Sequence, residues 1–183
     1  MSVTIEPAEF SYVDFDAVRL AEIVAEVGAA LGFDPSTTII VEVDERMPFG
    51  NHELRSLDPI RCFVESGALE HPQRIRKMSD EGAREMVGRL LIEARDRLDP
   101  AFGAPALDQP VDVAPRVAWD AYAIGRLVRL GGRNQRQRRL YQFRNQHGFD
   151  DRADAAFARL WAAESLTYPE ICEISDSARQ SAA

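Results

Sequence analysis

The chain has 183 residues, of which 45% are apolar and 28% are charged, and its net charge is −8. This length and balance are typical of one ordinary globular domain, since domains run to about 100–200 residues. The acidic charge argues against general affinity for nucleic acid or acidic membranes, and no stretch approaches the ~18 apolar residues that a membrane span requires.

A helix followed by a strand is predicted near the start of the chain. Apolar residues recur at helical spacing over 14–31, with polar residues between them. Asp14 or Asp16 can cap the start of this helix, and Gly32 can end it. The residues of 37–43 are mostly β-branched and alternate in character, which predicts a strand with one face more buried than the other.

A second strand is predicted over 60–69, with a bulge expected at Gly67. The segment 44–59 between the two strands contains turn formers and has no period, so it is expected to be a loop. Two strands form a poor sheet by themselves. One or two more short strands are therefore expected within 3–12 or 46–54.

The clearest helix of the sequence covers 79–98, and Ser79 can cap its start. A proline-rich, extended connector is expected over 101–116. Four helices are expected after the connector, over 117–130, 134–146, 151–164 and 167–177. The last of them begins with Thr167 and Glu170 at the spacing of a capping box.

This order of elements predicts an α+β fold. N-terminal amphipathic helices pack on one face of a small sheet, and a helical C-terminal half follows. We expect a single domain over 1–183, in which 1–100 is the part with helices and strands, 101–116 is the connector and 117–178 is the helical part.

The order of elements over 14–98 resembles that of zincin-like metalloproteases, in which a helix and strands precede a second major helix with two metal-binding histidines. The corresponding stretch here, Met86 to Glu93, contains no histidine. The resemblance therefore implies at most a metal-free relative of that fold, and no active residue is carried over.

The histidines of the chain do not have metal-ligand spacing. None of the three lies four residues from another, and His52-Glu53 opens like the zinc motif H-E-x-x-H but lacks its second histidine. A site built from His52, Glu65 and His71 is the one weak metal candidate. We expect these histidines to lie in exposed loops, and we expect no metal or other cofactor.

The sequence also gives little support for a catalytic serine or cysteine nucleophile. Ser66 follows a strand, but no histidine is evidently near it to act as a base. Cys62 sits in an apolar alternation, so burial should raise its pKa and suppress its reactivity. Cys62 and Cys172 read as small buried hydrophobic residues of a reducing compartment, and the N-terminus lacks the basic start of a secretory signal. A cytoplasmic, bacterial type of protein is expected.

The sharpest local feature is a run of arginines. Seven lie between Arg126 and Phe149, with no acid and with Tyr141 and Phe143 interleaved. Arg136, Arg139 and Arg144 could bind phosphate or carboxylate from one helix. The preferred interpretation is that these arginines pair with the acids of the N-terminal half or at a subunit interface, because exposed arginines commonly meet carboxylates.

Three functional hypotheses follow from these patterns. The leading one is a non-catalytic module that binds a protein partner or forms a homo-oligomer. The second is a zincin-like α+β protein without HExxH, or a hydrolase with an atypical site between the 44–59 loop and the 79–98 helix. The third is binding of an anion or nucleic acid through Arg126–Arg144, with nucleic acid disfavoured by the acidic charge.

Overall fold

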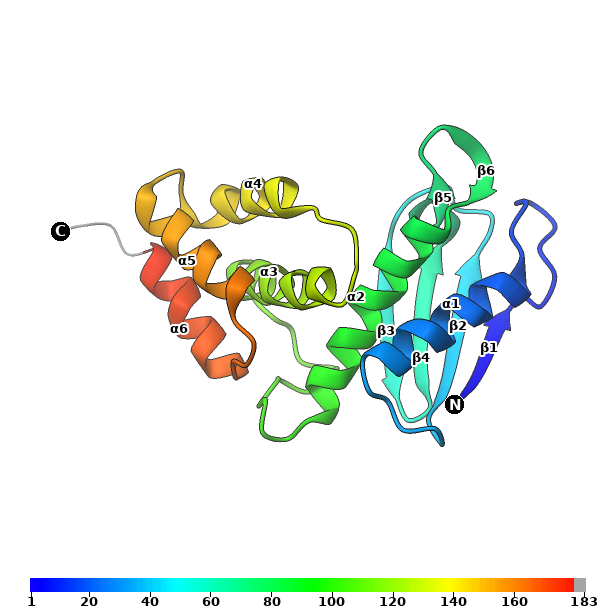
Figure 1. Cartoon of the computed structure of the whole chain (residues 1–183), viewed down its shortest axis with the longest axis horizontal. Helices are drawn as coiled ribbons and strands as arrows, with labels where there is room; N and C mark the ends of the chain where they lie inside the picture. Colours follow the sequence, from blue (N-terminus) through cyan, green and yellow to red (C-terminus); the bar gives the residue numbers. More distant parts are fainter. Residues whose placement is uncertain (180–183) are drawn as a thin grey trace. The chain divides into compact units, whose positions relative to one another are not determined.

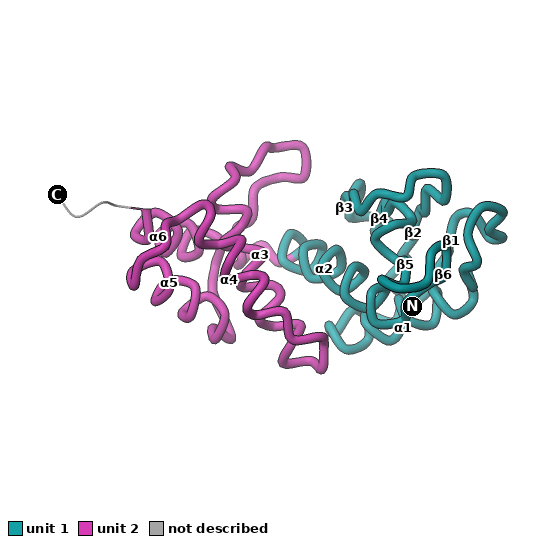
Figure 2. Tube along the Cα trace, turned by 90° about the horizontal axis from the view of Figure 1, so that it is seen from above, with its two compact units in different colours: residues 1–98 teal, residues 99–183 magenta. Residues whose placement is uncertain are grey.

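The computed structural model describes residues 1–179, and the chain divides into two compact units, Met1–Leu98 and Asp99–Ala183 (Figure 2). The first unit contains all the described strands, and the second is helical. The predicted α+β class is therefore confirmed. The expectation of one domain stays a prediction, because compactness alone does not show whether either unit folds by itself.

The first unit is built on a four-stranded sheet with the order β1-β2-β4-β3 (Figure 1). Its strands are β1 (Ser2–Glu6), β2 (Thr38–Asp44), β3 (His52–Leu57) and β4 (Ile60–Glu65). Strand β2 runs parallel to both β1 and β4, whereas β3 is antiparallel to β4. A separate hairpin of β5 (Glu70–His71) and β6 (Arg74–Met78) follows a 3-10 turn at Ser66–Ala68.

Two helices, α1 (Ala17–Ala30) and α2 (Asp80–Leu98), cover one face of this sheet (Figure 1). The alternate residues Ile39, Val41 and Val43 of β2 are buried, as the alternation in the sequence predicts. They meet the apolar stripes of the helices, which include Leu20 and Leu91. Burial of one sheet face and one stripe on each helix is what holds this unit together.

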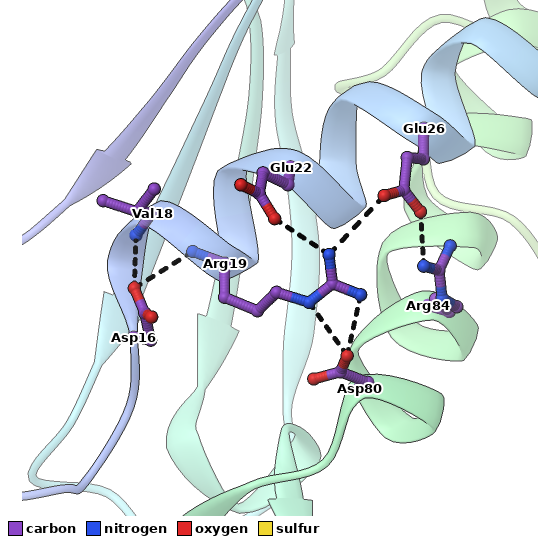
Figure 3. Close-up of polar contacts among 7 residues, drawn as sticks. All are labelled: Asp16, Val18, Arg19, Glu22, Glu26, Asp80 and Arg84. Atoms are coloured by element: carbon purple, nitrogen blue, oxygen red, sulfur yellow. Dashed lines mark hydrogen bonds and ion pairs between the residues drawn. The ribbon is translucent and has the colours of Figure 1, made fainter.

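Charged side chains also join the two helices (Figure 3). The Arg19 guanidinium on α1 contacts Glu22 and Glu26 of its own helix, and it lies 2.8 Å from Asp80 at the start of α2. Arg84 of α2 binds Glu26 in turn. The hydrogen bonds that Arg19 donates to Glu22 and Asp80 raise the pKa of its guanidinium. Arg19 thereby joins the start of α2 to α1.

Most element predictions for this unit are confirmed, with two corrections. Asp16 caps α1 through the N–H groups of Val18 and Arg19, and strands occur in both segments where more were expected. The segment 44–59 is not all loop, because β3 occupies its second half. Gly67 is no bulge, since it lies in the 3-10 turn after β4 ends at Glu65. The sheet's irregularity is on β3 instead.

The second unit consists of α3 (Val113–Arg129), α4 (Arg136–His147), α5 (Asp151–Ala162) and α6 (Tyr168–Arg179). Its core includes the fully buried side chains of Tyr122, Phe143 and Phe157. All four predicted helices are present, but α3 begins four residues before the predicted start and takes in Pro115. Proline is tolerated there because the first turn of a helix has no intrahelical partner for its N–H groups.

The capping box before α6 is confirmed. The Glu170 carboxylate accepts from the backbone N–H of Thr167 at 2.7 Å, and the Thr167 hydroxyl accepts from the N–H of Glu170 at 3.4 Å. Within residues 1–179 no helix has the length and apolarity to cross a membrane.

Candidate anion site at the start of α4

The three weak metal candidates are not gathered into one centre. His52 opens β3, and its Nδ1 lies 3.1 Å from the carbonyl of Gly50. Glu65 is buried and accepts hydrogen bonds from both the backbone and the side chain of Asn51. His71 accepts from the N–H of Gln73 in the β5–β6 hairpin. In the described part of the chain no three His, Cys, Asp or Glu side chains lie close enough to hold a metal ion.

The nucleophile candidates of the first unit are both enclosed. Ser66 has no exposed surface, and its hydroxyl donates to the carbonyl of Met47 at 3.1 Å. Burial raises the pKa of Cys62 to about 12, as its place in the apolar alternation predicts. A thiol with that pKa stays protonated at neutral pH and is a poor nucleophile.

A serine–histidine pair that the sequence did not reveal lies in the second unit. His147 Nε2 is 2.8 Å from the Ser175 hydroxyl, and its Nδ1 is 3.0 Å from the carbonyl of Phe143. Both side chains are buried, with Ser175 fully so, and burial lowers the pKa of His147. This geometry is that of a nucleophile and its base, but a substrate cannot reach the enclosed hydroxyl, so the pair is structural.

Most of the arginine run serves the second unit's own fold. Arg139 is buried and binds Asp120 at 2.8 Å, and Arg144 forms a bidentate pair with Asp154. The Arg144 guanidinium holds the pKa of Asp154 below its usual value. Both arginines therefore pair with carboxylates of their own unit. The sequence had instead predicted pairing with the acids of the N-terminal half.

Two further arginines of the run have structural contacts. Arg129 donates to the carbonyls of Trp161 and Ala163 at 2.7 and 2.5 Å, and so caps the C-terminal end of α5. The Arg126 guanidinium lies 4.0 Å from the ring centroid of Tyr122. Three of the seven arginines thus join one helix to another, and Arg126 packs on a ring of its own helix.

The other three arginines line one hollow. Arg133, Arg136 and Arg138 are exposed, and with Asn134, Gln135 and Gln137 they line a cavity of about 530 Å³ at the start of α4. The Arg136 guanidinium lies 5.4 Å from the ring centroid of the buried Phe157. Neither Arg136 nor Arg138 forms an ion pair with a carboxylate of residues 1–179.

The helix end within this hollow is not neutralised. The first turn of α4 has no acidic residue, and its N-cap, Gln135, makes no side-chain cap hydrogen bond. The neutral amide oxygen of Asn134 accepts from the N–H of Arg136 at 3.0 Å, which leaves the charge of the helix end in place. The positive end of the helix dipole therefore adds to the charge of the arginines. Gln135 is only 9% exposed, yet its Oε1 is buried without a hydrogen-bond partner in the described residues.

The arrangement can hold an anion through guanidinium groups and backbone N–H groups. Of the three arginines predicted to bind an anion, only Arg136 lines the hollow. Arg139 lies four residues before Phe143 and next to Leu140, both buried, so its place on the apolar face was a readable signal of burial. The parts played by Arg133 and Arg138 had no comparable signal, because their neighbourhood depends on how the loop before α4 turns.

Comparisons of the chain with known protein families, with curated proteins and with solved structures found no match.

Proposed function

We propose that this protein is a non-catalytic binding module for a small phosphate-bearing ligand, which it takes up in the hollow at the start of α4. One observation carries the proposal: three exposed arginines line a hollow at a helix N-terminus whose first turn has no acid. Arginine presents a planar fork of donors that matches the oxygens of phosphate. A helix N-terminus adds oriented N–H groups.

The size of the hollow suits a small ligand, and its lining favours binding over catalysis. Its volume of about 530 Å³ falls in the range of about 300–1,000 Å³ for small-molecule sites. Its lining contains arginines and amides and neither a serine, a cysteine nor a carboxylate.

The two cysteines of the chain are unpaired, which supports the further proposal of a cytoplasmic location. Self-association stays a prediction.

Isothermal titration with inorganic phosphate at low ionic strength tests this function. The wild-type protein should bind one phosphate, and Arg136→Gln or Arg138→Gln should weaken the affinity on the order of tenfold, since a charge-assisted hydrogen bond contributes about 1.5–3 kcal/mol. Arg74→Gln is the matched control, because it removes an exposed arginine from the β5–β6 hairpin. Equal binding by all four proteins, or no binding by the wild type, would refute the proposal.

A further inference from the structure

A pair of aromatic rings lies exposed beside the arginine hollow. Tyr141 is 60% exposed and Phe149 is 65% exposed, and their ring centroids are 5.9 Å apart at an interplanar angle of 71°. Large aromatic side chains are usually buried in a protein that has a core of this size. Phe143, the other aromatic residue of the arginine run, is buried and packs on His147 and Phe157. Of the two aromatic residues within the arginine run, Phe143 is therefore part of the core and Tyr141 is on the surface.

Local structure places the ring pair next to the hollow. Tyr141 follows Arg138 by three residues on α4, so the two side chains are neighbours on the same helix face, separated by about 4.5 Å along the axis. Gly148 ends the helix with a φ of 112°, a conformation that side chains disfavour. This turn sends the chain back, and Phe149 meets Tyr141. Asp150 then caps α5 through the N–H of Ala153.

We infer that the phosphate-bearing ligand is a mononucleotide, with its phosphate in the hollow and its base stacked on the ring pair of Tyr141 and Phe149. The inference rests on the proposed function. A nucleotide carries an anionic group and a flat aromatic group a short distance apart, which is the pairing that Arg138 and Tyr141 present. Aromatic side chains stack on any base, and such stacking is worth on the order of tenfold in affinity.

A longer nucleic acid fits these features less well. The hollow is of a size for one small ligand, and the net charge of −8 disfavours binding of a polyanion to the chain as a whole.

The test compares adenosine 5′-monophosphate with ribose 5-phosphate by isothermal titration on the full chain. The nucleotide should bind about tenfold more tightly. Tyr141→Ser should abolish this preference, whereas Tyr141→Phe, which keeps the ring, should retain it, as should the control Arg74→Gln. Far-ultraviolet circular dichroism checks that each variant is folded.

The outcomes separate this inference from the proposed function. Equal affinity for the two ligands, with both weakened by Arg138→Gln, would overturn the nucleotide and leave the phosphate site standing. Binding of neither ligand would overturn both. A single-stranded octanucleotide that bound more than a hundredfold tighter than the mononucleotide would also overturn the inference, because the ligand would then be a nucleic acid strand.

Discussion

At the scale of single residues, His147 shows how a buried group depends on one protonation state. Its Nδ1 donates to the Phe143 carbonyl, so its Nε2 accepts the proton of the Ser175 hydroxyl. A second proton would remove this acceptor from a fully enclosed hydroxyl. Burial, together with Arg179, lowers the pKa of His147, while the Phe143 carbonyl and Asp176 oppose the shift. The folded state therefore favours the neutral ring.

This imidazole should make the protein less stable in acid. Because its pKa is lower in the folded state, the unfolded chain binds the proton first, and stability is lost as the pH falls below about 6.5. The slope from this one group is at most about 1.4 kcal/mol per pH unit. Urea denaturation at pH 7.5 and pH 5.5 should show the loss in the wild type and a smaller loss in His147→Gln. An unchanged pH dependence in the variant would contradict this account.

The sequence predicted single residues well where one local rule decides their place. Asp16 and Thr167 cap helices as their types and positions predict, and Cys62 is buried as its alternation predicts. The role of an arginine was harder to predict. Arg139 and Arg138 are adjacent in sequence, but one is buried against Asp120 and the other is exposed, and this difference is set by tertiary contacts.

At the scale of elements, the contact of α3 with α5 depends on the absence of a side chain at Gly125. A Cβ there would lie 2.4 Å from the carbonyl oxygen of Trp161, and that carbonyl accepts from Arg129. In α2, by contrast, a Cβ at Gly82 would meet only ordinary contacts, the nearest 3.4 Å away on Ser79. The two glycines therefore occupy similar helical backbone but very different surroundings.

Substitution of these two glycines by alanine should have opposite effects. Gly125→Ala should destabilise the protein by about 1–3 kcal/mol, because the helices must move apart. Gly82→Ala should be neutral or stabilise it by up to about 1 kcal/mol, since alanine is the better helix former. Chemical denaturation measures both. A Gly125→Ala protein as stable as the wild type would show that α3 and α5 are not in close contact.

Prediction of whole elements succeeded for long periodic segments and failed for short ones. The apolar stripe of α2 and its Ser79 cap predicted the bounds of that helix to within one residue. Strand β3 reads His-Glu-Leu-Arg-Ser-Leu, and its charged residues conceal the alternation because it lies at the edge of the sheet with one neighbour. Strands β5 and β6 are defined mainly by pairing with each other, which a local pattern does not contain.

At the scale of the whole molecule, the charge is divided unevenly between the two units. The first unit has 19 acidic and 11 basic residues, a net charge of −8, whereas the second has 11 of each. The proposed site lies in the unit that is neutral overall. An anion approaching this site therefore meets local positive charge that is not outweighed within its own unit. The acidic surplus of the chain belongs to the unit with the sheet.

Ligand binding should be visible in thermal stability. A ligand that binds only the folded second unit, at 100 times its Kd, adds about 2.7 kcal/mol to the free energy of unfolding. Differential scanning calorimetry with adenosine 5′-monophosphate should therefore show a higher Tm, and Arg136→Gln should reduce the increase. If the scan resolves two transitions, the shift should fall on one of them alone. An equal shift of both would place the ligand elsewhere.

Strand β1 has a consequence for how shortened forms of the protein would behave. It pairs with β2 from Ser2 to Glu6 and so shields the outer side of a strand whose Ile39 and Val41 are buried. A form that lacked these few residues would present β2 as a bare edge, with unpaired N–H and C=O groups open to another molecule. Insolubility of such a form would then reflect strand pairing between molecules, and would say nothing about the ligand site.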